Sequence, residues 1–314
     1  MFSIVIPYYN KAKYIQRCID SVWNQSFNEY EIILVNDGAT DNGLHFLTKQ
    51  NSKNIAIVNQ ENKGVSEARN AGIAIAKNQY IAFLDADDCW HPNYLEKVKE
   101  LIDKESDVKI IGSKYVRNID FIKDECNDLD YFKFDDYFKA ALKNTYFTSS
   151  STIVAMSFFT HNYGFNSNLQ SGEDIDVWFR AVYSGGNAFY INNQLVYYSD
   201  EDENQVTKSK PDLKKSLVGN ISNLYAEELK SNHNKSFRKL VSVYIYFNLY
   251  PYFFDLRYRE EAKKVLNENQ LFLFWLNLLY ILPFSIGAKL MQSKNNNKKI
   301  RLYLKFIIRY HPKI

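Results

Sequence analysis

Three aspartates follow a short apolar run in the sequence IAFLDADDCW, which covers residues 81–90. Asp85, Asp87 and Asp88 repel one another unless a counter-charge lies close to them. In an extended Asp-x-Asp the side chains of Asp85 and Asp87 project to the same side, so both can approach one cation. Carboxylate oxygens, together with substrate phosphates, are the ligands that Mg²⁺ and Mn²⁺ prefer. The segment therefore predicts a metal-bound phosphate site, although a solvated acidic turn has the same composition.

The elements that position these aspartates follow a regular alternation in the first hundred residues. Apolar, β-branched runs predict four strands, at FSIVIP, EIILVN, NIAIVN and YIAFLD. Apolar residues at helical spacing predict helices at residues 12–23, around Leu44, at residues 65–76 and after Pro92. This alternation indicates an α/β fold with a mostly parallel sheet, whose ligands bind at the carboxyl ends of the strands.

Polar residues at the ends of the other strands fit a nucleotide. Pro7 stops the first strand in PYYN, and the carboxylate of Asp37 can accept hydrogen bonds from the imino N–H and ribose of a nucleoside. In NKGVSEARN, Gly64 begins a helix and Arg69 lies about one turn later, where its guanidinium can pair with phosphate or carboxylate.

Together, SIVIPYYN, EIILVNDGATD, NKGVSEARNAG and YIAFLDADDCWHPNYLE resemble the inverting glycosyltransferases of family 2 in order and spacing, over roughly residues 2–200. The resemblance implies a Rossmann-like GT-A fold, a nucleotide-sugar donor and Mg²⁺ or Mn²⁺. It implies that Asp85 and Asp87 hold ribose and the metal-bound diphosphate, and that Asp88 touches the sugar or caps the next helix. The predicted donor-binding residues are Pro7, Tyr8, Tyr9, Asn10, Asp37, Gly64, Arg69, Asp85, Ala86, Asp87 and Asp88.

A fifth segment, FNSNLQSGEDIDVWFRA, resembles the acidic motif that lies near the acceptor in this family. The resemblance implies that Asp174 is the general base and that Glu173 supports it or binds sugar. Gly172 also allows a sharp turn into a helix that would hold Asp174 in its first turn, where the helix dipole favours negative charge. An ordinary helix start would use the same two acids.

The sequence departs from the family pattern after LVYYS, where many relatives carry a metal-binding histidine. Asp200, Glu201 and Asp202 stand there instead, and any of them could replace that ligand. The Gln-x-x-Arg-Trp segment of processive synthases and an array of spanning helices are both missing, which favours a single sugar addition. By frequency in the family, a UDP-sugar is the expected donor, with UDP-glucose first, and the expected acceptor is a lipid-linked glycan such as a polyprenyl-diphosphate oligosaccharide.

The chain is expected to form a catalytic domain at residues 1–205 and a helical region at residues 206–314. The apolar segment Leu271–Ala288 is interrupted by polar residues and Pro283, which favours a buried or interfacial helix over a spanning one. From Lys289 onward there are eight basic residues and no acid, which predicts either a helix on anionic lipid or a docked helix with its basic face in water. We therefore expect peripheral binding at the cytoplasmic face of the plasma membrane.

Composition narrows the function classes further. A formal net charge of +3 gives no basic field for nucleic acid. The cysteines Cys18, Cys89 and Cys126 show no paired spacing, and the start of the chain has no signal-peptide pattern, which suits a reducing compartment. A nucleotidyltransferase remains an alternative, although PYYNKAKY lacks a glycine-rich phosphate loop. A non-catalytic, membrane-tethered nucleotide-binding protein would leave SGEDID unexplained.

Overall fold

The computed structural model divides the chain into two compact units. Unit 1 contains Met1–Asp135, Tyr146–Leu169 and Glu173–Ser209, and unit 2 contains Asp136–Thr145, Gln170–Gly172 and Lys210–Ile314. The structure describes residues 1–45, 47, 54–120, 126, 128–201, 211–231, 234–269 and 274–310. The domain boundary predicted near residue 205 lies outside these described residues, as does Phe46 of the helix predicted around Leu44. The described residues of that helix, Leu44 and Leu47, lie in turns.

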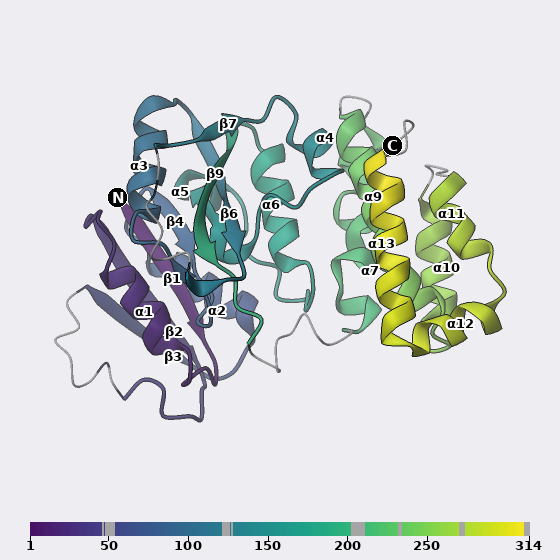
Figure 1. The fold of residues 1–314 in the computed structure, drawn as a ribbon, viewed down its shortest axis with the longest axis horizontal. Helices are drawn as coiled ribbons and strands as arrows, with labels where there is room; N and C mark the ends of the chain where they lie inside the picture. Colours follow the sequence, from purple (N-terminus) through teal and green to yellow (C-terminus); the bar gives the residue numbers. More distant parts are fainter. Residues whose placement is uncertain are drawn as a thin grey trace. The chain divides into compact units, whose positions relative to one another are not determined.

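Four parallel strands form the first half of the sheet in unit 1 (Figure 1). Strand β1 (Phe2–Tyr8) is flanked by β2 (Tyr30–Asp37) on one side and by β4 (Tyr80–Phe83) on the other, and β3 (Ile55–Gln60) follows β2. These are the four strands that the apolar runs predict. Side chains on both faces of β1 are buried, which is why its sequence is apolar almost throughout.

Two helices cover opposite faces of these strands. Ile4 and Ile6 of β1 share a core cluster with residues of α1 (Ile15–Trp23), whereas Val35 of β2 packs with Ala68 of α2 (Val65–Ile75). Successive side chains of a strand point to opposite faces of the sheet. The even-numbered residues of β1 therefore pack against α1, and the odd-numbered Val35 of β2 packs against α2. Helix α2 thereby begins at the sheet edge where β1, β2 and β4 end.

The second half of the sheet is mixed rather than parallel. Strand β8 (Thr152–Ala155) lies antiparallel between β4 and β6 (Val108–Val116), and β9 (Asn187–Tyr197) runs parallel to β6. The short strands β5 (Cys89–Trp90) and β7 (Tyr131–Lys133) pair antiparallel with β9. The remaining helices of unit 1 are α3 (Tyr94–Lys104), α5 (Met156–His161) and α6 (Glu173–Tyr183).

Two expectations about this half are wrong in detail. The segments NAFYI and LVYYS form one continuous strand, β9, because the polar residues between them are accommodated by register shifts against β6. Of the strand expected at SSSTIVAM, only Thr152–Ala155 is extended, and Ser149–Ser151 forms a 3-10 turn, η2, held by the side chain and backbone of Thr148. That turn brings Ser150 to the end of β4.

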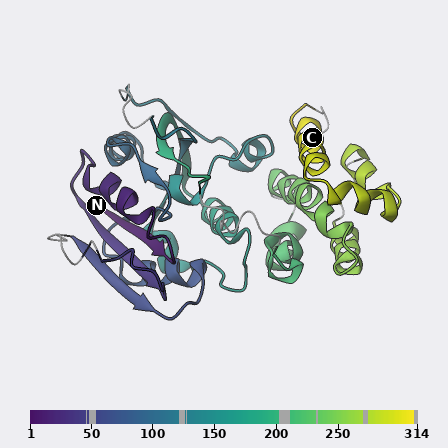
Figure 2. The same ribbon diagram turned by 60° about the horizontal axis from the view of Figure 1, so that its bottom comes forward.

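Unit 2 is helical throughout its described part (Figures 1 and 2). Buried Phe237 and Leu249 lie on the long helix α9, against which most of the other helices pack. The elements are α4 (Tyr137–Ala141), η4 (Leu213–Lys215), α7 (Leu217–Leu224), α8 (Ala226–Lys230), α9 (Lys235–Phe253), α10 (Arg259–Glu268), α11 (Phe274–Ile281), α12 (Phe284–Gln292) and α13 (Lys294–Tyr310).

The apolar segment Leu271–Ala288 does not form one helix. Its first three residues lie outside the described part, and the rest is split between α11 and α12 at Pro283, which cannot continue a helix. In the described residues, none of the helices has both the length and the apolar character that crossing a membrane requires.

Candidate functional site

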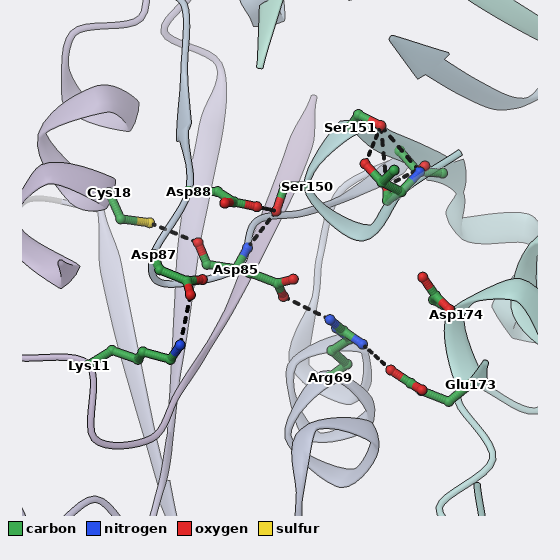
Figure 3. Close-up of polar contacts among 12 residues, drawn as sticks. Lys11, Cys18, Arg69, Asp85, Asp87, Asp88, Ser150, Ser151, Glu173 and Asp174 are labelled. Atoms are coloured by element: carbon green, nitrogen blue, oxygen red, sulfur yellow. Dashed lines mark hydrogen bonds and ion pairs between the residues drawn. The ribbon is translucent and has the colours of Figure 1, made fainter. Parts of the chain in front are cut away.

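The three aspartates of the predicted metal site lie in a turn at the carboxyl end of β4 (Figure 3). The turn is closed by the Asp88 amide, which donates to the Asp85 carbonyl at 3.0 Å. The Asp85 amide donates to Ser150 Oγ at 3.0 Å, and Ala86 is buried in the core of unit 1. The backbone of the turn is thus anchored on both sides, which leaves the carboxylates of Asp85 and Asp87 to make other contacts.

Each of these two carboxylates is paired with a cationic side chain. Lys11 Nζ lies 2.7 Å from Asp87 Oδ2, and Arg69 Nη2 lies 2.7 Å from Asp85 Oδ1. Figure 3 shows Lys11 reaching the turn from the loop after β1, and Arg69 reaching it from α2. The repulsion that the sequence predicts is therefore partly offset within the protein, by one cationic partner for Asp85 and one for Asp87.

Arg69 also links the turn to α6. Its guanidinium, 3% exposed, contacts Glu173 Oε1 at 3.2 Å and lies over the ring of Phe165 at 5.1 Å. Burial by itself lowers the pKa of Arg69, but the carboxylates of Asp85 and Glu173 outweigh it and raise that pKa above its usual value. One buried cation therefore holds the end of β4 and the first turn of α6 together.

Asp174, the predicted general base, is the second residue of α6. Gly172, with φ of +79°, makes the turn that starts this helix, and Asp174 Oδ1 accepts from the Ile175 amide at 2.7 Å. In Figure 3 the Glu173 carboxylate points from α6 to Arg69, and Asp174 lies next to it on the first turn of the same helix. Burial, with the charge of Glu173 second, raises the pKa of Asp174 to about 7. A carboxyl group with a pKa near neutrality is well suited to accept a proton.

Asp88 has a different environment from its two neighbours. It is buried, and its carboxylate accepts from Ser150 Oγ at 2.5 Å and from the Ser199 amide at 2.8 Å. Burial, reinforced by Asp85 and Asp87, raises the pKa of Asp88. The alternative that Asp88 caps the next helix is wrong, because Asn93 occupies the N-cap position of α3. Asp88 instead connects the metal-site turn to η2 and to the chain that follows β9.

The residues predicted to bind the nucleoside lie at the ends of β1 and β2. The Asp37 carboxylate accepts from the side chain of Gln60 and from the amides of Lys63 and Gly64, at 2.7, 2.8 and 2.9 Å. These bonds shape the loop before α2, and Gly64, with φ of +87°, provides the turn into the helix. Contact of Asp37 with a nucleoside stays a prediction.

The PYYN segment divides into a buried and an exposed part. Tyr8 is buried and its hydroxyl donates to Asp41, so burial first and the hydrogen bond second raise the pKa of Tyr8. Tyr9 is exposed, and Asn10 has a φ of +50° and accepts from the Thr40 amide at 2.8 Å. The prediction that Pro7 stops the first strand is wrong, because β1 continues through Pro7 to Tyr8 and still pairs with β2 there. Of these four, Tyr9 and Asn10 are the side chains open to a ligand.

The acids proposed to replace a metal-binding histidine already have protein partners. Asp200 pairs with Arg117 at 3.2 Å, and Glu201 pairs with Arg17 at 3.1 Å and accepts from Tyr197 at 2.8 Å. These hydrogen bonds, from Tyr197 first and Arg17 second, lower the pKa of Glu201. Asp202 lies outside the described residues.

The carboxylate oxygens at the end of β4 are nevertheless suitable ligands for Mg²⁺ or a similar ion. In the described part of the chain no three His, Cys, Asp or Glu side chains gather into a metal site. Mg²⁺, however, commonly uses only one or two protein carboxylates and takes its other ligands from water and substrate phosphates. Asp85 and Asp87 supply that number of hard oxygen ligands, two positions apart on one anchored turn. The extended Asp-x-Asp that the sequence predicts is wrong, because the chain turns here and the two carboxylates contact different cations, Arg69 and Lys11.

Two residues of this site do not follow from the sequence motifs. Lys11 is separated from Asp87 by 76 positions and Ser150 from Asp88 by 62 positions. The only local signals are that Lys11 follows PYYN at the end of a strand and that Ser150 stands in a run of three serines.

Comparison with known proteins places the chain in a family. The model of the family described as "Glycosyl transferase family 2" matches residues 3–162. The chondroitin synthase of Pasteurella multocida (strain Pm70) is 29% identical over 200 residues, which are 63% of this chain and 20% of that protein. The glycosyltransferase GlyG of Streptococcus pneumoniae is 37% identical over 121 residues, 37% of this chain and 39% of that protein. The chain thus spans only a fifth to two fifths of the length of these relatives.

Two solved structures have a similar fold. Residues 1–349 of TarS from S. aureus, in complex with UDP-GlcNAc, match with a TM-score of 0.68 at 16% identity, covering 98% of this chain and 90% of that one. The mannosyltransferase PcManGT from Pyrobaculum calidifontis, in complex with GDP-Man and Mn²⁺, matches with a TM-score of 0.59 at 15% identity, covering 100% and 88%. At this level of identity the likeness concerns the fold.

Proposed function

Because this chain belongs to glycosyl transferase family 2 and has the GT-A fold, we propose that it is an inverting, metal-dependent hexosyltransferase. In this proposal it transfers a single hexose from a UDP-sugar, with UDP-glucose as the first candidate, to a hydroxyl group of a glycan. The acceptor is a polyprenyl-diphosphate-linked oligosaccharide or another lipid-linked glycan, at the cytoplasmic face of the plasma membrane. The chain is a glycosyltransferase, and hence an enzyme, by its family.

One observation carries the mechanism: Arg69 contacts Asp85 and Glu173 at once. This pairing places the first turn of α6, with Asp174, beside the turn predicted to bind the diphosphate (Figure 3). A donor held at Asp85 and Asp87 would present its anomeric carbon to the region that Asp174 faces. Asp174 would accept the proton of the acceptor hydroxyl as that oxygen bonds to the anomeric carbon. The bond to the diphosphate breaks, the diphosphate leaves with the electron pair, and the configuration inverts.

Asp85 and Asp87 are the residues that would hold Mg²⁺ or Mn²⁺. The chemistry that such an ion supplies, when bound, is neutralisation of the negative charge on the leaving diphosphate. Lys11 and Arg69 place two further positive charges at the same turn. These side chains orient the phosphates and offset their charge. The protein and the metal ion would therefore both neutralise the negative charge of the diphosphate.

The UDP part of the proposal is supported by the TarS structure, which contains UDP-GlcNAc, and the metal part by the PcManGT structure, which contains Mn²⁺. The test is a panel of nucleotide sugars incubated with the full chain, Mn²⁺ and either membrane extract or synthetic polyprenyl-diphosphate glycans. We expect acceptor-dependent release of UDP with one sugar added per acceptor, as measured by mass spectrometry. Release of pyrophosphate, or nucleotide binding without any transfer, would support one of the alternative classes instead.

Activity should depend on pH through the carboxyl group of Asp174. The base works as the carboxylate, so kcat/KM should rise as the pH increases through about 7. The charge of Glu173 contributes to this raised pKa, and Glu173→Gln removes that charge while the positive charge of Arg69 remains. In Glu173→Gln the increase of kcat/KM with pH should therefore occur at a lower pH than in the wild type. An increase that stays at the same pH, or moves to higher pH, would show that Asp174 is not the group that titrates.

Lys11 should compete with the metal ion for Asp87. Its ammonium lies 2.7 Å from Asp87 Oδ2, so an arriving divalent cation must share or displace that contact. We expect Lys11→Met to bind Mn²⁺ alone about tenfold more tightly than the wild type, as measured by electron paramagnetic resonance of free Mn²⁺. Lys13→Met removes the same charge from an exposed neighbouring position and is the matched control. Equal Mn²⁺ affinity in Lys11→Met and Lys13→Met would contradict the competition.

A further inference from the structure

Helix α13, the last described element of unit 2, exposes a row of large apolar side chains. Leu302, Tyr303, Phe306 and Tyr310 are 57%, 41%, 60% and 65% exposed. Leu302, Phe306 and Tyr310 are four residues apart, so they follow one another along the same side of the helix. The rings of Phe306 and Tyr310 are in contact, with centroids 5.1 Å apart.

Packing within unit 2 does not account for this row. Leu304 and Ile308 are the buried residues of α13, and they attach the helix to the rest of the unit. The side chain of Asn297 accepts from the Tyr250 hydroxyl at 2.5 Å and fixes the same inner face. At about 100° per residue, the exposed row lies on the outer side of the helix. A helix that serves only as packing needs no such outer row.

The same helix is strongly basic. From Lys289 to Tyr310 the chain contains seven basic residues and no acid. Six of them are exposed on α13: Lys294, Lys298, Lys299, Arg301, Lys305 and Arg309. At helical spacing, Lys298, Lys305 and Arg309 lie along one edge of the apolar row. An apolar strip bordered by lysine and arginine is complementary to a lipid surface that carries negative phosphate groups.

We propose that the outer face of α13 docks on an anionic membrane surface. Leu302, Phe306 and Tyr310 enter the boundary between head groups and acyl chains, and the neighbouring lysine and arginine side chains contact lipid phosphates. The inference deepens the proposed function, because a lipid-linked acceptor lies at such a surface, but the docking itself requires no transfer chemistry. The absence of acidic residues distinguishes a lipid surface from a second copy of this basic helix, which would be repelled.

The experiment uses the purified full chain and vesicles, without donor or acceptor. Flotation with phosphatidylcholine vesicles should recover little protein, and addition of phosphatidylglycerol should give salt-sensitive binding. The double variant Leu302→Ser/Phe306→Ser should bind at least about tenfold more weakly, since two anchors are removed from the interface. Leu256→Ser, at a 76% exposed apolar residue outside α13, is the matched control and should bind as the wild type does.

Three outcomes would overturn the proposal. The first is a wild-type chain that fails to bind anionic vesicles. In the second, Leu256→Ser and the double variant bind equally. The third is a self-associated wild type that the double variant converts to monomers in sedimentation velocity, because that result would make the face an interface between copies. Transfer to a water-soluble acceptor should be unchanged in the double variant, so loss of docking is distinguished from failure of the proposed enzyme function.

Discussion

Asp174→Asn is expected to lower the rate of sugar transfer by about 10³-fold or more while donor binding stays nearly unchanged. General base catalysis contributes about 10²- to 10⁴-fold, and the position of the base beside the acceptor adds to that effect. The substitution keeps the shape of the side chain and the oxygen that accepts from the Ile175 amide, so α6 should keep its first turn. Single-turnover transfer gives the rate, and calorimetry with the UDP-sugar gives the affinity.

Glu173→Gln is the matched control for this prediction, because it changes the adjacent acid and leaves Asp174 in place. At a pH well above 7 it should retain most of the wild-type rate, whereas Asp174→Asn should keep its lowered rate at every pH. Turnover of Asp174→Asn at the wild-type rate would remove Asp174 from the mechanism. Equal loss in both variants would indicate that the α6 turn, rather than the base, had been damaged.

The second large effect is expected from Asp87→Ala. This change removes one of the two carboxylates predicted to hold the metal ion and leaves the ammonium of Lys11 without its partner on this aspartate. We expect transfer to fall by about 10³-fold, a loss of about 4 kcal/mol, because the leaving diphosphate loses most of its charge stabilisation. Binding of UDP should also lose its dependence on Mn²⁺ in calorimetry.

Asp200→Ala tests whether loss of any nearby aspartate has the same result. Asp200 pairs with Arg117 and is exposed, so its removal should change transfer by less than about threefold. An Asp87→Ala variant whose UDP affinity still increases with Mn²⁺ would contradict the metal role. Thermal denaturation of both variants should also be measured, to distinguish a loss of stability from a loss of metal binding, since Asp87 is buried and Asp200 is not.

The first four strands, and the position of the aspartates after β4, could be predicted from the sequence because the signals are local. An uninterrupted apolar run specifies a strand buried on both faces, and the first polar residues after it mark the edge of the sheet. Asp37 and Asp85 are located in this way, whereas Arg69 is located by the helix that Gly64 begins. The same local approach failed at Ser149–Ser151, where a serine run next to a β-branched segment indicates a strand but the hydrogen bonds of Thr148 form a turn.

The partners of the acidic residues could not be predicted because they come from distant parts of the chain. Arg69 meets Glu173 across 104 positions, and Lys11 meets Asp87 across 76. No periodicity or spacing encodes such contacts, since they depend on how α2, α6 and the loop after β1 are arranged around the sheet. The role of Asp88 cannot be predicted for the same reason, because its partners Ser150, in η2, and Ser199, just after β9, come close to it only in the folded chain.

A crystal structure of the Asp174→Asn variant with UDP-glucose and Mn²⁺ would test the central claim most directly, because this variant should bind the donor without consuming it. We predict an anomalous manganese peak that bridges the carboxylate of Asp87 and the diphosphate, with the side chain at position 174 facing the anomeric carbon from the side opposite the diphosphate. Manganese and diphosphate bound away from Asp85 and Asp87, or position 174 on the same side as the leaving group, would contradict the account.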